Sequence, residues 1–137
     1  MRRDCRVGRI LVADDDPAIR ALLTELLTDE GYDVLEAVDG RAAVEIALAL
    51  QPQVILMDLR MPHIDGIDAT RTLKADPRAD GIRIIAMSAG YNLRSVADQL
   101  PADSLIAKPF DLDALLADVA VQLHHAAAAT QSLTEHA

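Results

Sequence analysis

Short runs of consecutive apolar residues alternate along the chain with longer stretches in which apolar residues recur every three or four positions. Such short runs are typical of strands buried on both faces, and the spaced stretches are typical of amphipathic helices. We expect strands at residues 10–13, 32–37, 53–58, 82–87 and 105–107. We expect helices between Asp16 and Gly31, between Asp39 and Pro52, over residues 67–75, over residues 93–100, and from Asp111 to Leu123.

Aspartates precede three of these helices, where a carboxylate can accept a hydrogen bond from the first helical turn. Asp16 is followed by Pro17, which is favoured at the first helical position. The alternation of strands and helices predicts one (βα)₅ domain with a parallel sheet covered on both faces. We place this domain at residues 9–123, after a lead-in at 1–8, and expect residues 124–137 to form a helix extension or a flexible tail.

The composition fits a single globular domain. A chain of 137 residues with 51% hydrophobic residues can bury a core. No apolar run approaches the ~20 residues of a membrane span, and the basic start lacks the apolar segment of an export signal. Cys5 is the one cysteine, so no internal disulfide can form. We therefore expect a cytoplasmic protein without membrane contact.

The charge balance argues against direct binding of nucleic acid. The net charge is −9, with 22 acidic and 13 basic residues, whereas phosphate backbones attract basic surfaces. Arginines gather near the N-terminus, and we interpret them as a solvated lead-in. Tryptophan is absent, so the chain has few aromatic side chains on which bases or sugars could stack.

Polar residues that could bind a ligand or take part in a reaction end or follow four of the expected strands. Asp14 and Asp15 follow the first strand, Asp58 ends the third, Ser88 follows the fourth and Lys108 follows the fifth. Singly, each has an ordinary explanation as a cap, a turn residue or a solvated side chain. In parallel α/β folds, however, ligands bind at the carboxyl ends of the strands, so these residues predict one shared site.

Three carboxylates in one crevice raise one another's pKa values, and a divalent cation removes that conflict. An oxygen-rich site with few carboxylates is of the Mg²⁺ type. The Ser88 hydroxyl and the Lys108 ammonium beside such a site could bind the oxygens of a phosphoryl group. Asp58 would be the nucleophile, giving an aspartyl phosphate, while the cation and Lys108 neutralise the transferring oxygens.

Four segments, ILVADDDPAIR, VILMDLRMPHIDG, IIAMSAG and LIAKPF, occur in this order. On these segments the chain resembles the receiver domain of bacterial two-component response regulators, the CheY-like family, over about residues 8–123. The resemblance implies a flavodoxin-like fold with strand order 2-1-3-4-5. It also implies a signalling protein that takes a phosphoryl group from a histidine kinase and then switches its partner binding, catalysing only its own phosphorylation and dephosphorylation.

The resemblance assigns roles around a Mg²⁺ ion. Asp58 is implied to be the phosphoacceptor and a metal ligand. Asp15 is implied to bind the metal directly, and Asp14 to hold it largely through water. The backbone carbonyl of Arg60 is implied as a further ligand.

Other roles concern the phosphoryl group and the loop beside it. Ser88 matches the hydroxyl that moves to bond the phosphoryl group, and Ala89 matches the small residue that keeps the pocket open. Lys108 matches the lysine that pairs with a phosphoryl oxygen, and the bond to the proline that follows is usually cis. Pro62 and Gly66 are expected to shape the loop after Asp58.

The implied partners are a sensor histidine kinase or a histidine phosphotransfer protein, and downstream a protein partner or a second copy. The downstream face consists of the fourth helix, fifth strand and fifth helix. Leu105 occupies the place where the family usually has an aromatic switch residue. Leu105 could be buried in both states or exposed as part of an apolar contact surface, and we favour exposure because a surface leucine suits association.

Three other classes of protein match parts of this pattern. A phosphatase or phosphotransferase of the haloacid dehalogenase type needs a second acid two residues after the nucleophile, where this chain has Arg60. A dinucleotide-binding module needs G-x-G-x-x-G after the first strand, which is absent. An inert docking receiver is disfavoured because the acids, the serine and the lysine are all present.

Overall fold

The structure, a computed structural model, describes residues 8–61, 65–89 and 100–136, with the exception of the side chains of Ala89 and residues 127–136. The helix expected over 93–100 lies almost wholly outside these residues, as does Pro62. No helix in the described part of the chain is long and apolar enough to cross a membrane.

Five parallel strands form one sheet in the order β2-β1-β3-β4-β5, as expected. The strands are β1 (Arg9–Ala13), β2 (Asp33–Ala37), β3 (Val54–Asp58), β4 (Arg83–Ala89) and β5 (Ser104–Lys108). The last two strands run one or two residues further than the apolar runs indicate, because their pairing continues through Ser88 with Ala107 and Ala89 with Lys108.

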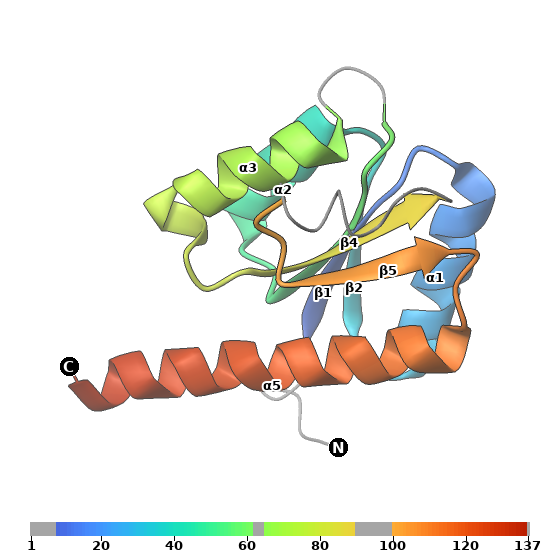
Figure 1. The fold of residues 1–137 in the computed structure, drawn as a ribbon. Coiled ribbons are helices and arrows are strands. Elements are labelled where there is room, and N and C mark those ends of the chain that lie inside the picture. The colour runs from blue at the N-terminus through green and yellow to red at the C-terminus, as the bar shows by residue number, and fades with distance from the viewer. Residues whose placement is uncertain (1–7, 62–64, 90–99, 137) are drawn as a thin grey trace.

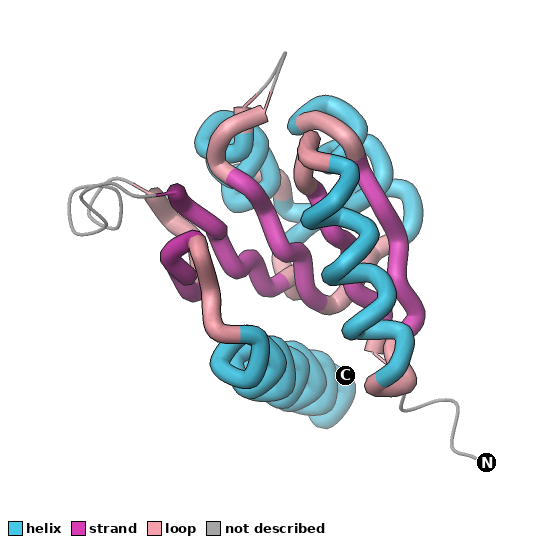
Figure 2. Tube along the Cα trace, turned by 90° about the vertical axis from the view of Figure 1, so that its right-hand side faces the viewer, coloured by secondary structure: helices cyan, strands magenta, loops and turns pink. Residues whose placement is uncertain are grey.

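Helices cover both faces of the sheet (Figures 1 and 2). Helices α1 (Pro17–Asp29) and α5 (Leu112–His136) lie on one face, and α2 (Gly40–Leu50) and α3 (Gly66–Ala75) lie on the other. A 3₁₀ turn, η2 (Pro77–Ala79), follows α3. Helix α5 continues through residues 124–136 and projects past the sheet (Figure 1). The domain limits themselves stay a prediction.

Aspartate caps start the helices as the sequence predicts. The side chain of Asp16 accepts from Ala18 N–H at 2.9 Å, and that of Asp39 accepts from Ala42 N–H at 2.8 Å. Asp111 accepts from Asp113 N–H at 2.9 Å. A cap that was not predicted, Asp65, accepts from Asp68 N–H at 2.9 Å, and so α3 begins at Gly66 rather than at residue 67.

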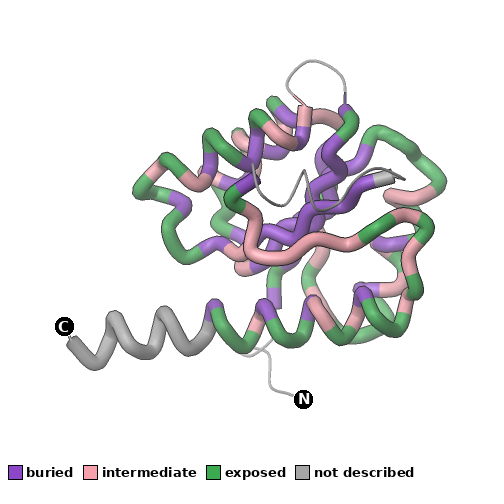
Figure 3. The backbone as a smooth tube through the Cα atoms, viewed as in Figure 1, coloured by how far each residue is buried: buried purple, intermediate pink, exposed green. Residues whose placement is uncertain are grey.

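The alternation of side chains along the strands divides the core between the two faces. The side chains that pack with α1 and α5 are Ile10, Val12, Leu56, Ile85 and Met87. The side chains that pack with α2 and α3 are Leu11, Ala13, Ile55, Met57 and Ile84. Full burial of each large aliphatic side chain stabilises the fold by about 1.5–3 kcal/mol. β1, β3 and β4 therefore form the buried middle of the molecule (Figure 3).

Candidate functional site

Every described residue assigned to the site lies at the carboxyl end of the sheet. Asp14 directly follows β1, Asp58 is the last residue of β3, and Lys108 is the last residue of β5. Asp58 pairs with Met87 by register, so Ser88 is the next residue along the neighbouring strand. Ser88 is buried. The backbone of Ala89 pairs with Lys108, and its side chain is outside the described part.

The three predicted metal-binding acids meet in one cluster. Carboxylate oxygens of Asp14, Asp15 and Asp58 lie within 4.8 Å of one another. Asp14 and Asp58 are buried, whereas Asp15 is exposed. The cluster therefore has two fixed carboxylates at its base and one at its opening to solvent.

Lys108 reaches this cluster from β5, an edge strand of the sheet. Its Nζ lies 2.9 Å from Asp14 Oδ2 and 3.4 Å from Asp58 Oδ1. Burial lowers the pKa of Lys108, but the hydrogen bond to Asp14 and the charges of Asp14 and Asp58 outweigh burial, so the pKa is raised. Lys108 is thus a cation at neutral pH and balances one of the three negative charges.

The carboxyl group of Asp58 is harder to ionise than an ordinary aspartate. Burial is the main cause, and the charge of Asp14 adds to it. Lys108 and the backbone N–H of Arg60, which donates to Asp58 Oδ1 at 3.3 Å, act in the opposite direction. The net effect raises the pKa of Asp58 from 3.8 to about 6. Near neutral pH the ionised form is therefore the major one, although burial and the charge of Asp14 disfavour it.

Metal-free protein is expected to lose stability as the pH rises from about 4 to above 6. Because the folded state holds the Asp58 proton more tightly than the unfolded state, protonation favours folding below pH 6, and this gain disappears at higher pH. After allowance for solvent screening, we expect about 1 kcal/mol between pH 5 and pH 7.5. Urea unfolding in EDTA at both pH values measures it. Asp58→Asn is the control and should lack this component; an identical pH dependence in both proteins would contradict the assignment.

The residues present fit a Mg²⁺ ion. Mg²⁺ prefers hard oxygen ligands, keeps several waters and uses one or two carboxylates. The cluster supplies only oxygen ligands, retains more negative charge than Lys108 balances, and opens to solvent at Asp15. The position of the Arg60 carbonyl as a further ligand stays a prediction.

Gly66 lies against the backbone of the proposed acceptor. A Cβ atom at Gly66 would stand 2.0 Å from the Asp58 carbonyl oxygen and 2.7 Å from Leu59 Cα. The Gly66 N–H donates to Leu59 O at 3.2 Å, and the Leu59 N–H donates to Met87 O at 3.0 Å. The start of α3 therefore packs directly on the peptide that carries Asp58, which is the physical reason for a glycine at this place in the loop.

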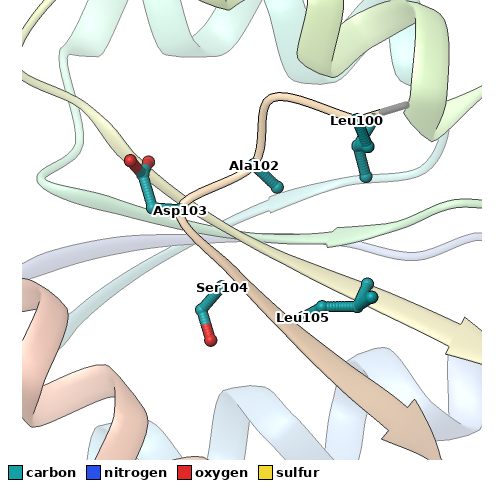
Figure 4. Close-up of a pocket in the computed structure, with 5 residues that line it drawn as sticks. All are labelled: Leu100, Ala102, Asp103, Ser104 and Leu105. Carbon is teal, nitrogen blue, oxygen red and sulfur yellow. The ribbon is translucent and has the colours of Figure 1, made fainter. Parts of the chain in front are cut away.

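Leu105 is half-buried, which is neither the buried nor the exposed state that the sequence suggested, and its role at a contact surface stays a prediction. Figure 4 shows that it leaves β5 away from Ser104, and it packs against a small cluster that includes Leu59, Ala86 and Leu100. It also lines a cavity of about 240 Å³ beside Ala102 and Leu100. Exposure was favoured because a surface leucine suits association, but the neighbouring apolar side chains cover part of Leu105.

Arg20 was missed by the sequence reasoning. It lies in the first turn of α1, and its Nη1 donates to the main-chain carbonyl of Asp14 at 2.8 Å. Its Nε donates to Glu36 Oε1 at 3.2 Å. A cation in the first turn of a helix is unfavourable because it opposes the helix macrodipole. This placement in the sequence could have indicated that Arg20 makes a compensating contact.

The fold and the acidic cluster define a class: a parallel α/β domain with an acid pair, a further buried carboxylate and a lysine at one end of the sheet. The family model described as "response regulator receiver domain" matches residues 10–120, so the chain belongs to this family of two-component signalling proteins. Receiver domains are signalling modules that interact with histidine kinases. The haloacid dehalogenase alternative is not supported.

Relatives of known function share this domain. The DNA-binding dual master transcriptional regulator RpaA of Synechocystis sp. is 39% identical over 116 residues, which cover 81% of this chain and 47% of RpaA. Sporulation initiation phosphotransferase F of Bacillus subtilis is 36% identical over 107 residues, covering 77% of this chain and 85% of that protein. The chain spans about half of the length of RpaA and of other DNA-binding relatives.

A solved structure with a similar fold contains ligands. The response regulator TrrA of Thermotoga maritima, in complex with Mg²⁺ and BeF, has a TM-score of 0.77 and 31% identity to this chain. The match covers 85% of this chain and 99% of that one.

Proposed function

We propose that Asp58 accepts a phosphoryl group from the phosphohistidine of a sensor histidine kinase or of a histidine phosphotransfer protein. The observation that carries the proposal is the arrangement around Asp58. Its buried carboxylate stands 3.4 Å from the Lys108 ammonium and within 4.8 Å of the carboxylates of Asp14 and Asp15. A buried carboxylate that lies near both an ammonium group and two further carboxylates is better explained as a site for phosphoryl transfer than as a structural ion pair.

In the proposed transfer, an ionised Asp58 oxygen attacks the phosphorus atom. The new oxygen–phosphorus bond forms as the phosphorus–nitrogen bond to the donor imidazole breaks, and the electron pair leaves with the ring nitrogen. Positioning and charge neutralisation supply most of the acceleration in such reactions. Lys108 needs only a small shift of its Nζ, which is already beside Asp58, to contact a transferred oxygen.

We propose that Mg²⁺ is held by Asp14, Asp15, Asp58 and the carbonyl of Arg60. A bound Mg²⁺ supplies positive charge against the phosphoryl oxygens. The oxygen-only cluster supports this assignment, as does the presence of Mg²⁺ with BeF in TrrA. Asp14 is fixed by Lys108, so adjustment to the ion falls mainly to the exposed Asp15.

We further propose that Ser88 and Ala89 complete the phosphoryl pocket and that signalling proceeds through protein contacts. Ser88 lies on β4 beside the strand that ends in Asp58, and Ala89 is the next residue. The output would be binding of a downstream protein, or of a second copy, at the face that includes β5 and its half-buried Leu105. DNA binding belongs to longer relatives such as RpaA, and a net charge of −9 does not favour it here.

The test is Mg²⁺-dependent labelling by acetyl phosphate, followed by intact-mass spectrometry. Wild-type protein is expected to gain one phosphoryl group with Mg²⁺ and none with EDTA, because the acidic cluster repels a phosphoryl dianion unless a cation is bound. The matched control is the same incubation with inorganic phosphate, which carries no activated phosphoryl group. Equal labelling with and without EDTA would contradict the proposal.

A further inference from the structure

A side chain from α1 holds the backbone between the two acids that follow β1. Arg20 Nη1 donates to Asp14 O at 2.8 Å, and Arg20 Nε donates to the Glu36 carboxylate of β2 at 3.2 Å. The Arg20 side chain is only 18% exposed, so water competes weakly for these bonds. The guanidinium thus connects α1, the end of β1 and β2.

This contact bears on Asp15 because the Asp14 carbonyl belongs to the peptide that joins Asp14 to Asp15. The remaining polar groups of Asp14 are also held: its N–H donates to Ala37 O at 3.1 Å. Its two carboxylate oxygens accept from Asp16 N–H and from Lys108 Nζ, each at 2.9 Å. Each of these polar groups of Asp14 therefore has a partner, and the Arg20 hydrogen bond is made to the peptide that leads to the exposed Asp15.

We propose that Arg20 is a positioning residue for the metal site: it orients the Asp14–Asp15 peptide so that the Asp15 carboxylate faces Asp14 and Asp58. Glu36 keeps the guanidinium in place. The inference rests on the proposed function, since it assumes that Asp15 and its neighbours hold Mg²⁺. It adds a residue outside the acidic cluster that determines the affinity of the cluster for the ion.

The direction in which the Mg²⁺ affinity changes when Arg20 is replaced distinguishes a positioning role from a purely electrostatic one. Removal of a positive charge near the site would, by charge alone, tighten Mg²⁺ binding by about two-fold. Loss of a residue that orients a metal ligand weakens binding, by about 10-fold in typical sites. The two explanations therefore predict opposite directions for the same substitution.

Arg9 provides a matched control at the other end of the sheet. Its Nε donates to the Asp33 carboxylate of β2 at 3.1 Å, and its Nη1 donates to the Leu50 carbonyl at 3.0 Å. These are the same two kinds of bond that Arg20 makes, but they lie at the amino ends of the strands. Arg9→Met therefore removes the same two kinds of bond, at a side chain that is 45% exposed, without an effect on the metal site.

The experiment is an NMR titration of backbone amides with Mg²⁺ alone at pH 7.5. We expect Arg20→Met to raise the Kd for Mg²⁺ by about 10-fold. Arg20→Lys, which keeps one donor for the Asp14 carbonyl, should stay within about three-fold of wild type, and Arg9→Met within about two-fold. Arg20→Gln, which is neutral and shorter, serves as a second variant if Arg20→Met does not fold, and should weaken binding similarly.

A neutral Arg20 variant that binds Mg²⁺ as tightly as wild type, or more tightly, would overturn the inference and leave the proposed function intact. Equal weakening by Arg9→Met would also overturn it, because the effect would then be one of stability. Absence of Mg²⁺ binding by wild type would overturn the proposed function and the inference together.

Discussion

Gly66→Ala is expected to destabilise the protein by about 3 kcal/mol, at the upper end of the usual range for an added methyl group in a packed site. Alanine is the better helix former by up to about 1 kcal/mol, so propensity alone predicts stabilisation at the start of α3. The contact decides the sign, because the new Cβ would stand 2.0 Å from the Asp58 carbonyl oxygen. Backbone, rather than a flexible side chain, would have to move.

The displacement should also reach the site, because the clashing peptide carries Asp58. We expect weaker Mg²⁺ binding and slower labelling by acetyl phosphate in addition to the lower stability. Gly81→Ala is the matched control, since a Cβ at Gly81 meets nothing within 4 Å. Urea unfolding of both variants measures the effect, and a Gly66→Ala protein as stable as Gly81→Ala would contradict the packing described here.

Asp58→Asn is expected to reduce labelling by acetyl phosphate by at least about 100-fold, because an amide oxygen cannot replace the carboxylate nucleophile. The variant should still fold, and in EDTA at pH 7.5 it should be more stable than wild type, since it removes a buried charge that Asp14 repels. Asp39→Asn is the control: it changes a capping aspartate, and asparagine caps equally well. Labelling of Asp39→Asn should match wild type.

Local signals explain why so much of the fold could be predicted. A cap such as Asp16 and a turn such as that at Gly31 are determined by residues close in sequence. Buried apolar runs fix the strands, and the short connections between alternating strands and helices favour a parallel sheet. The grouping of Asp14, Asp15, Asp58 and Lys108 could be predicted for the same reason, because these residues lie at strand ends, while their roles stay predictions.

Contacts between distant residues were not predictable from these patterns. Arg20 donates to Asp14 only six positions away, but its guanidinium also donates to Glu36 on β2, sixteen positions away. The steric need for glycine at Gly66 depends on how α3 returns to β3. Likewise, the partial burial of Leu105 depends on the packing of Leu59 from another strand end, which no periodicity reveals.

Chemical trapping of the phosphorylated residue tests the central claim most directly. Wild-type protein would be incubated with acetyl phosphate and Mg²⁺, and the acyl phosphate would be reduced with borohydride, which converts a phosphorylated aspartate to homoserine. Peptide mass spectrometry then locates the change. The account predicts homoserine at position 58 and unchanged aspartates at 14 and 15. Homoserine at either of those positions, or none at position 58 in protein that has gained a phosphoryl group, would contradict it.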